Sequence, residues 1–111
     1  MSKNVLATFQ SVTAGDMSAQ VISEITDIRW LDNMVMYIDF TGTPTGTFYV
    51  ECSPDKTNWY ALNLFPVPVA SGVNGNHRIY MNQLPDPYIR TRYTPASGTG
   101  TMNVKIGGKL V

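Results

Sequence analysis

Apolar and polar residues alternate most clearly in the middle of the chain. In residues 34–40 (MVMYIDF) every second side chain from Met34 to Phe40 is apolar, and residues 47–53 (TFYVECS) alternate in the same way. Because successive side chains of a β-strand point to opposite faces, each run predicts a strand with one buried face. Residues 41–46 (TGTPTG) supply turn residues between the runs, so the sequence predicts that the two strands pair as a hairpin.

Shorter runs of the same kind occupy most of the remaining chain. Residues 69–76, which contain the turn signal Asn74-Gly75, predict a loop, and residues 94–100 predict another turn region. Residues 25–31 are less regular and are interpreted as a strand or an irregular segment. Further strands are predicted at residues 5–12, 19–22, 59–65, 78–81, 88–93 and 101–106.

The number and spacing of these runs indicate the fold class. Seven to nine short strands separated by turn residues are typical of all-β sandwiches. A chain of 111 residues is long enough for one hydrophobic core but not for two. The sequence therefore predicts that residues 1–111 form a single antiparallel β-sandwich, jelly-roll-like in its arrangement.

Charge is scarce and balanced, which limits the possible partners. Only 14% of the residues are charged, and eight basic residues offset eight acidic ones. Neutrality promotes association, so the composition favours a protein that works in an assembly. Nucleic acid is not expected as a partner, because lysine and arginine are not clustered. No membrane contact is expected, because no stretch approaches roughly 18 apolar residues. The N-terminus lacks a signal-peptide pattern, so we expect synthesis in a cytoplasm.

Residues able to perform covalent or metal chemistry are few. His77 is the sole histidine and is predicted to be an exposed edge residue rather than a catalytic base. Cys52 is the sole cysteine and is predicted to be a buried thiol in a strand. Asp39 and Glu51 would lie near each other on the predicted hairpin, as in a glycosidase, but a solvated face paired with arginine or lysine is favoured. We therefore expect no catalytic residue, no metal and no cofactor.

Two groups of side chains suit an interface. Tyr37 and Tyr49 are predicted to point outward, and exposed aromatic residues can anchor a sugar or a protein partner. Trp59, which follows the loop at residues 53–58, either belongs to such a site or, as we favour, covers the end of the core. Arg90 and Arg92 share a strand face and either bind carboxylates of a partner or solvate that face. The candidate partner-binding residues are thus Tyr37, Tyr49, Trp59, Arg90 and Arg92.

Four stretches occur in an order that resembles a β-sandwich pattern of tailed-phage virion proteins. They are a strand at 47–53 (TFYVECS), a corner at 53–59 (SPDKTNW), a strand at 88–93 (YIRTRY) and a turn with a last strand at 96–104 (ASGTGTMNV). The pattern covers about residues 46–108. Length and overall character extend the likeness, and the chain resembles the small capsid decoration proteins, also called staple or cement proteins, of epsilon15-type short-tailed phages.

This resemblance implies a jelly-roll-like domain on the outer surface of an icosahedral virion. There it would bind the major capsid protein, clamp neighbouring subunits and associate with a second copy of itself as a dimer. Residues 1–15 would then extend as an arm over a neighbour, since terminal segments order when they are tied down. The alternative is a carbohydrate-binding or structural sandwich of the phage tail or baseplate, in which Trp59 and Tyr60 would contact a glycan.

Overall fold

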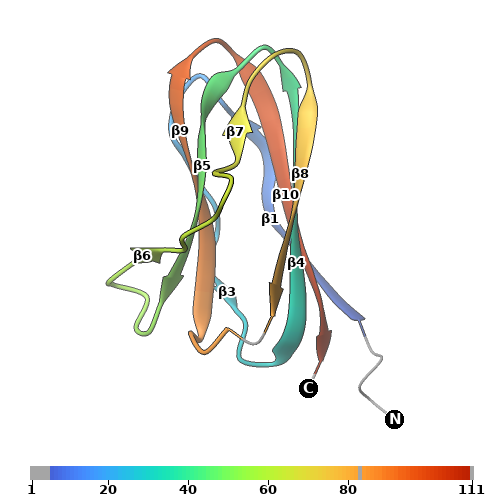
Figure 1. Cartoon of the computed structure of the whole chain (residues 1–111), viewed down its shortest axis with the longest axis vertical. Coiled ribbons are helices and arrows are strands. Elements are labelled where there is room, and N and C mark those ends of the chain that lie inside the picture. Colours follow the sequence, from blue (N-terminus) through green and yellow to red (C-terminus); the bar gives the residue numbers. More distant parts are fainter. Residues whose placement is uncertain (1–5, 83, 111) are drawn as a thin grey trace.

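The computed structural model describes residues 6–82 and 84–110, and within these ranges all regular secondary structure is β-strand. The strands form two antiparallel sheets that pack face to face (Figure 1). The predicted all-β antiparallel sandwich is thus confirmed. The strands are β1 (Leu6–Asp16), β2 (Val21–Ile22), β3 (Thr26–Asp27), β4 (Leu31–Gly42), β5 (Thr45–Ser53), β6 (Tyr60–Ala61), β7 (Val69–Ala70), β8 (Gly75–Asn82), β9 (Tyr88–Ser97) and β10 (Gly100–Leu110).

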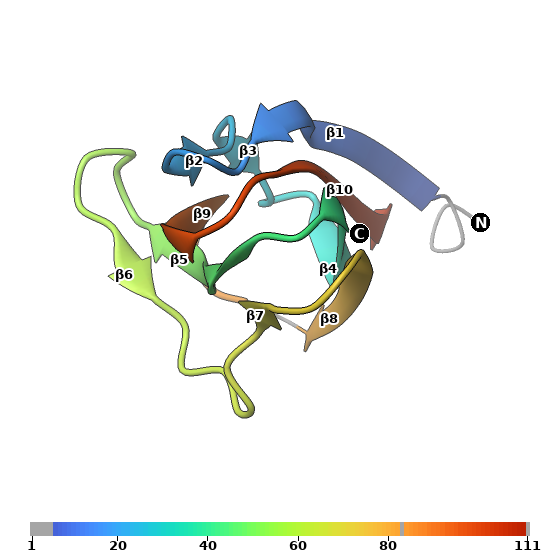
Figure 2. The same cartoon turned by 90° about the horizontal axis from the view of Figure 1, so that it is seen from above.

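The two sheets differ in the lengths of their strands. The first sheet has the order β1-β10-β4-β8 and consists of long strands. The second has the order β2-β9-β5-β6, with β3 also pairing with β9 and β7 with β5. Viewed from above, the two layers enclose the core, with β1, β2 and β3 at one edge and β7 and β8 at the opposite edge (Figure 2). The body is elongated and measures 45 × 28 × 24 Å.

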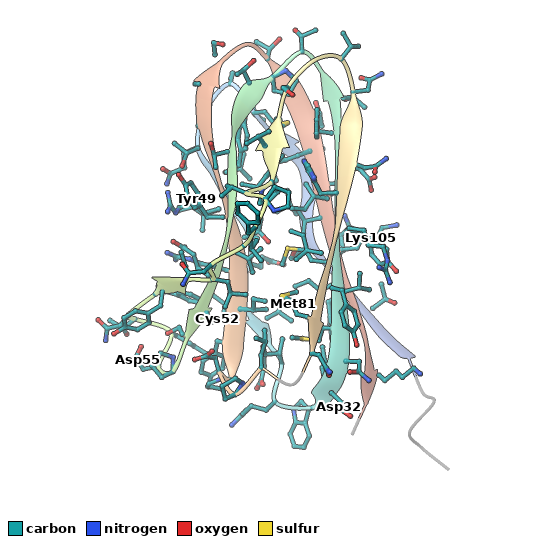
Figure 3. All side chains as sticks on the ribbon, viewed as in Figure 1. Asp32, Tyr49, Cys52, Asp55, Met81 and Lys105 are labelled. Carbon is teal, nitrogen blue, oxygen red and sulfur yellow. The ribbon has the colours of Figure 1, made fainter. Side chains whose placement is uncertain are left out.

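The core is formed by the faces that the alternating runs predict. Figure 3 shows Cys52 and Met81 between the sheets, whereas Tyr49 and Lys105 lie on opposite outer sides. Burial of each large apolar side chain stabilises the fold by about 1.5–3 kcal/mol. The inward residues of the four central strands are Met34, Met36, Ile38 and Phe40 of β4, Phe48, Val50 and Cys52 of β5, Ile89, Thr91 and Tyr93 of β9, and Met102, Val104 and Ile106 of β10.

The predicted hairpin between residues 34–40 and 47–53 is wrong. β4 pairs with β10 and β8 in the first sheet, whereas β5 pairs with β9 in the second. The chain therefore passes from one sheet to the other between β4 and β5. Gly42 makes this crossing with φ +92°, and a Cβ there would lie 2.7 Å from the carbonyl oxygen of Thr99. Two strands that face each other across a core bury the same faces as a hairpin does, so alternation alone could not separate the two arrangements.

The separation of β4 and β5 also removes the predicted pair of carboxylates. Asp39 lies in the first sheet, between Asn76 of β8 and Asn103 of β10 in the register. Glu51 lies in the second sheet, opposite Arg90 of β9. The two acids therefore belong to different layers of the sandwich and do not form a glycosidase-like pair.

The irregular segments differ from the prediction in detail. Only Tyr60–Ala61 of the predicted strand at 59–65 forms a strand, followed by one further backbone hydrogen bond from Leu62 to Val50 of β5. The chain then continues through a cis peptide bond at Phe65-Pro66. The predicted loop at 69–76 contains the short strand β7, and β8 already begins at Gly75. The predicted turn at 94–100 is shorter, because β9 continues to Ser97 and β10 begins at Gly100.

The predicted N-terminal arm is largely part of the sandwich. β1 pairs with β10 from Leu6 opposite Lys109 to Asp16 opposite Thr101, so residues 6–15 of the proposed arm form an edge strand. The inward side chain of Val12 is buried, which ties this segment to the core. Residues 1–5 of the predicted arm lie outside the described residues.

Candidate interaction site on the second sheet

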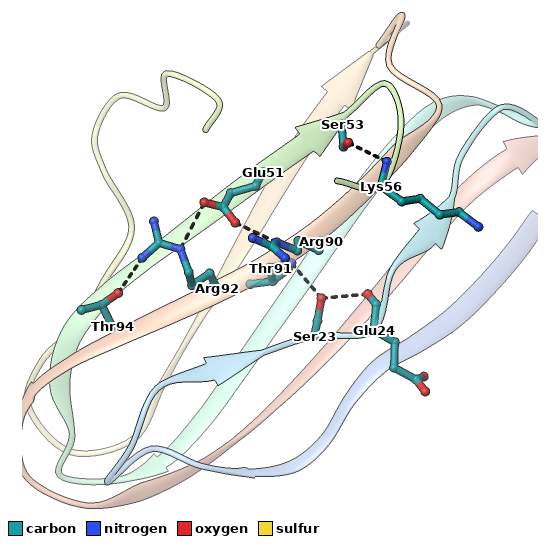
Figure 4. Close-up of polar contacts among 9 residues, drawn as sticks. All are labelled: Ser23, Glu24, Glu51, Ser53, Lys56, Arg90, Thr91, Arg92 and Thr94. Carbon is teal, nitrogen blue, oxygen red and sulfur yellow. Dashed lines mark hydrogen bonds and ion pairs between the residues drawn. The ribbon is translucent and has the colours of Figure 1, made fainter. Parts of the chain in front are cut away.

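A cluster of three charged side chains lies on the outer face of the second sheet. Glu51 of β5 stands between Arg90 and Arg92 of β9, as Figure 4 shows. Nε of Arg90 donates a hydrogen bond to Oε1 of Glu51 at 2.9 Å, and Nε of Arg92 donates to Oε2 at 3.1 Å. One carboxylate thus binds both guanidinium groups, which leaves one net positive charge on the cluster.

Glu51 is buried although it points away from the core. Its side chain is 8% exposed, against 21% for Arg90 and 28% for Arg92, because the two guanidinium groups cover it. Hydrogen bonds between charged groups are shorter and stronger than neutral ones, and they stabilise a buried carboxylate. The interpretation of Glu51 as a solvated surface acid is therefore wrong, although its pairing with arginine agrees with the favoured alternative.

Two aromatic rings extend the cluster on either side. Cζ of Arg90 lies 4.2 Å from the ring centroid of Trp59, and Cζ of Arg92 lies 4.4 Å from that of Tyr49. Such cation–π contacts contribute about 0.5–1 kcal/mol each at exposed sites. The side chains form a row, Trp59–Arg90–Glu51–Arg92–Tyr49, which we call the arginine row.

The arginine row unites four of the five predicted partner-binding residues. The fifth, Tyr37, lies on the outer face of the first sheet, on the opposite side of the molecule. Sequence reasoning did not place Glu51 in this group, although arginines at two positions of one strand face indicate a shared acid on a neighbouring strand. Whether the arginine row binds a partner remains a prediction.

Trp59 is held in the row by a rigid corner at residues 53–58. The hydroxyl of Ser53 accepts the backbone N–H groups of Asp55 and Lys56, and the Asp55 carboxylate accepts those of Thr57 and Asn58. These bonds to Asn58 and Thr57 lower the pKa of Asp55 to about 2. The predicted corner is thus present, but the prediction that Trp59 covers the end of the core is wrong, because its ring lies on Arg90 outside the sheet.

His77 and Cys52 both make contacts that belong to the packing of the sandwich. Nε2 of His77 lies 2.7 Å from the carbonyl oxygen of Val69, and its ring packs against Phe40 and Phe48, so it links β8 to β7 at one edge. Burial, with a smaller contribution from Asp86, raises the pKa of the Cys52 thiol to about 12.

Among residues 6–82 and 84–110, no group of three or more His, Cys, Asp or Glu side chains is placed to hold a metal ion. No helix in these ranges is long and apolar enough to cross a membrane.

Exposed apolar side chains gather at both long edges of the sandwich. At the edge of β1, β2 and β3, which we call the β1 edge, they are Phe9, Ile22, Ile25 and Trp30. At the opposite edge, which we call the β8 edge, they are Phe65, Val67, Val69 and Tyr80. Trp30 is 65% exposed and Phe65 is fully exposed. Sequence reasoning did not name either residue as a candidate for partner binding, because it treated Phe65 as the end of a predicted strand at residues 59–65 and Trp30 as part of an irregular segment.

Comparison with known proteins identifies the fold. No protein-family model matches the sequence, and no curated protein matches it significantly. The crystal structure of the SPBc2 prophage-derived protein YomS is similar to this chain, with a TM-score of 0.66 over 94% of both chains at 12% identity. The crystal structure of FLHE aligns over 94% of both chains at 11% identity, with a TM-score of 0.36. At this identity the likeness to YomS shows a shared fold.

Proposed function

We propose that this protein is a non-enzymatic decoration protein of a tailed-phage capsid. It binds the outer surface of the icosahedral shell, contacts the major capsid protein and clamps neighbouring subunits of it. The observation that carries the proposal is the pair of exposed apolar edges, the β1 edge and the β8 edge, on opposite sides of one rigid body. The resemblance to epsilon15-type decoration proteins and the prophage origin of YomS support a phage setting.

Two adhesive edges allow one molecule to contact two neighbours at once. Docking of the first edge makes the second contact intramolecular, so two weak contacts give a strong combined attachment. Ligands that bind the assembled shell better than free subunits stabilise the shell by mass action, by about 2.7 kcal/mol per site at a hundred times Kd. No covalent chemistry is required, which agrees with the scarcity of nucleophiles and bases in the sequence.

The arginine row suits a polar contact beside these edges. Its net positive charge and its flat aromatic ends fit a surface that carries carboxylates, since guanidinium groups bind carboxylates with defined geometry. Self-association of the protein on the shell remains a prediction, which sedimentation equilibrium of the free protein would test.

The two-edge arrangement is tested by one substitution on each edge. Trp30→Ser alters the β1 edge and Phe65→Ser alters the β8 edge, and both side chains are exposed, so the fold should persist. We expect each variant to bind shells more weakly and to lose the protection that the wild-type protein gives to shells on heating. Val73→Ser, which is also exposed but lies in the β7–β8 loop, is the matched control. Full protection by both edge variants would contradict the proposal.

One observation favours glycan binding as a second candidate function. Tyr37 and Tyr80 line a shallow, mainly apolar hollow of about 250 Å³ on the first sheet, next to Gly107, which contributes no side chain. Aromatic residues beside such a hollow can stack on a sugar ring. The Trp59 and Tyr60 site of the original alternative is less suitable, because Arg90 occupies one face of Trp59. Loss of glycan-array binding in Tyr37→Ala would support this second function.

A further inference from the structure

The free edge of β8 is unlike the other sheet edges in the described part of the chain. β1, at the opposite edge of the first sheet, has irregularities between Gln10 and Val12 and between Val12 and Gly15. The edge strands of the second sheet are two residues long. Short or bulged edge strands prevent unwanted pairing. β8 has eight residues in unbroken register with β4 and contains no proline, lysine or acidic residue.

The hydrogen-bond pattern shows which groups of β8 are free. In antiparallel strands, alternate residues bond to the neighbour on one side and then on the other. The N–H of Met17 donates to the carbonyl of Gly100, so the backbone groups of Gly100 point towards β1. By alternation, the even-numbered residues of β10 form their backbone hydrogen bonds with β1, and the odd-numbered ones form theirs with β4. In β4 the odd-numbered residues therefore bond to β10 and the even-numbered ones bond to β8. The odd-numbered residues of β8 lie opposite these and bond to β4, so the N–H and C=O groups of its even-numbered residues point to the free edge. These residues are Asn76, Arg78, Tyr80 and Asn82.

No partner for these backbone groups exists within residues 6–82 and 84–110. β8 pairs only with β4 there, and no backbone hydrogen bond from a turn or loop engages it. The neighbouring segment at 64–69 is linked to β8 by the side chain of His77 rather than by a ladder. Pro66 and Pro68 lack N–H groups, so this segment is poorly suited to act as the missing strand.

An apolar groove lies beside this free edge. It has a volume of about 550 Å³ and is bounded by residues 64–69 on one side and by residues 77–80 of β8 on the other. Phe65 and Val67 stand exposed on its wall, and Arg78 is the sole residue with a permanent charge in its lining. An extended peptide beside β8 would therefore place alternate apolar side chains in the groove and an acidic side chain near Arg78.

We propose that β8 binds one extended peptide segment as an additional strand of the first sheet. Strand addition gives affinity through main-chain hydrogen bonds and specificity through pockets for alternate side chains. The inference rests on the proposed function for the source of the segment, which is an extended part of the major capsid protein.

A single segment fits this edge better than a second copy of the protein. Figure 2 shows the chain between β6 and β7 standing out past the free edge of β8. Edge-to-edge pairing of two sandwiches would bring this projecting segment against the partner's body, whereas one added strand needs only about 4.8 Å beside β8. The groove between the segment and β8 is accessible to one chain.

The test replaces an N–H group that only an added strand would use. Arg78→Pro removes an N–H directed to the free edge and keeps the bonds to β4, and Arg78→Gln removes the same charge but keeps the N–H. Both proteins are titrated against shells stripped of the wild-type protein, with melting temperatures recorded for each. We expect Arg78→Pro to bind at least about tenfold more weakly than Arg78→Gln. In the wild-type protein, hydrogen exchange of the Arg78 and Tyr80 amides should slow on shell binding.

Other outcomes overturn the proposal in distinguishable ways. Equal binding of the two variants, while the wild-type protein binds, would show that β8 is not paired and would leave the proposed function intact. No binding by the wild-type protein would contradict the proposed function itself. A dimer of the free protein that Arg78→Pro abolishes would assign the edge to a second copy.

A second pair of variants covers the case in which Arg78→Pro fails to fold. Val67→Lys places a charge on the groove wall at an exposed position, and Val73→Lys places one outside the groove. We expect only Val67→Lys to weaken shell binding, and equal effects of the two would overturn the proposal.

Discussion

At the scale of single residues, Glu51 determines the geometry of the arginine row. Its two carboxylate oxygens each accept one Nε–H group, and its side chain is 8% exposed. Without it, Arg90 and Arg92 would lie side by side without a counter-charge, and like charges at such positions repel each other. The row is therefore a structural unit whose members depend on one acid.

Replacement of Glu51 should destabilise the protein measurably. Hydrogen bonds to charged groups contribute about 1.5–3 kcal/mol, so Glu51→Ala is expected to lower the free energy of unfolding by an amount in that range. Urea denaturation provides the measurement. Glu24→Gln, at an exposed position, is the control and should change stability by less than about 0.5 kcal/mol. Equal stability of the two variants would refute the described geometry of the row.

Asp55 should make the corner at residues 53–58 sensitive to acid. Its folded-state pKa of about 2 lies below the unfolded value of about 3.9, so its contribution is present above pH 4 and is lost as the pH falls through 2. We expect wild-type protein to melt at a higher temperature than Asp55→Ala at pH 5, and the difference to shrink towards pH 2. A difference that stays constant over this range would argue against the hydrogen bonds of the carboxylate.

At the scale of elements, the β5–β6 corner carries Trp59 on the outside of the sheet. Its ring lies on Arg90, and it does not belong to the buried core cluster. The corner thus presents an aromatic surface that is fixed by side-chain hydrogen bonds rather than by burial.

Trp59→Ala distinguishes this position from a place in the core. Loss of one cation–π contact and some packing is expected to cost less than about 2 kcal/mol. Truncation of a core tryptophan costs about 3–5 kcal/mol, which a thermal or urea melt would separate from the smaller value. A loss in the larger range would place Trp59 in the core and contradict the structure.

The sequence predicted the faces of the long strands but not their neighbours. The inward residues of β4, β9 and β10 follow from alternation, because that pattern reports which side of a strand is buried. It does not report which strand lies alongside, so the β4–β5 hairpin was predicted where the chain changes sheets. The same limit hid the Glu51 contacts, which depend on the register of β5 against β9.

The irregular segments were the least predictable part. Local rules predicted a strand from Trp59 to Phe65 that ends before Pro66, but only Tyr60–Ala61 forms a strand. The full exposure of Phe65 reflects the path of the chain between β6 and β7, which alternation of apolar and polar residues does not report. Four of the five predicted partner-binding residues did come together, because Arg90 and Arg92 share one face of β9.

At the scale of the whole molecule, the opposite edges suit a bridge between two neighbours. An elongated sandwich of 45 × 28 × 24 Å keeps the β1 edge and the β8 edge at a fixed separation. A rigid spacer loses little entropy when its second edge docks, which favours simultaneous engagement of both. On a shell built from repeating subunits, one molecule would bind at each equivalent position.

The most direct test of the central claim counts the molecules that bind to a shell. Purified protein is co-sedimented with mature phage shells that lack it, and bound copies per shell are scored on a gel. Decoration of an icosahedral lattice predicts saturation at on the order of hundreds of copies, with shells that then survive heating better. Saturation at about a dozen copies or fewer, or no binding at all, would contradict the account and direct attention to the tail.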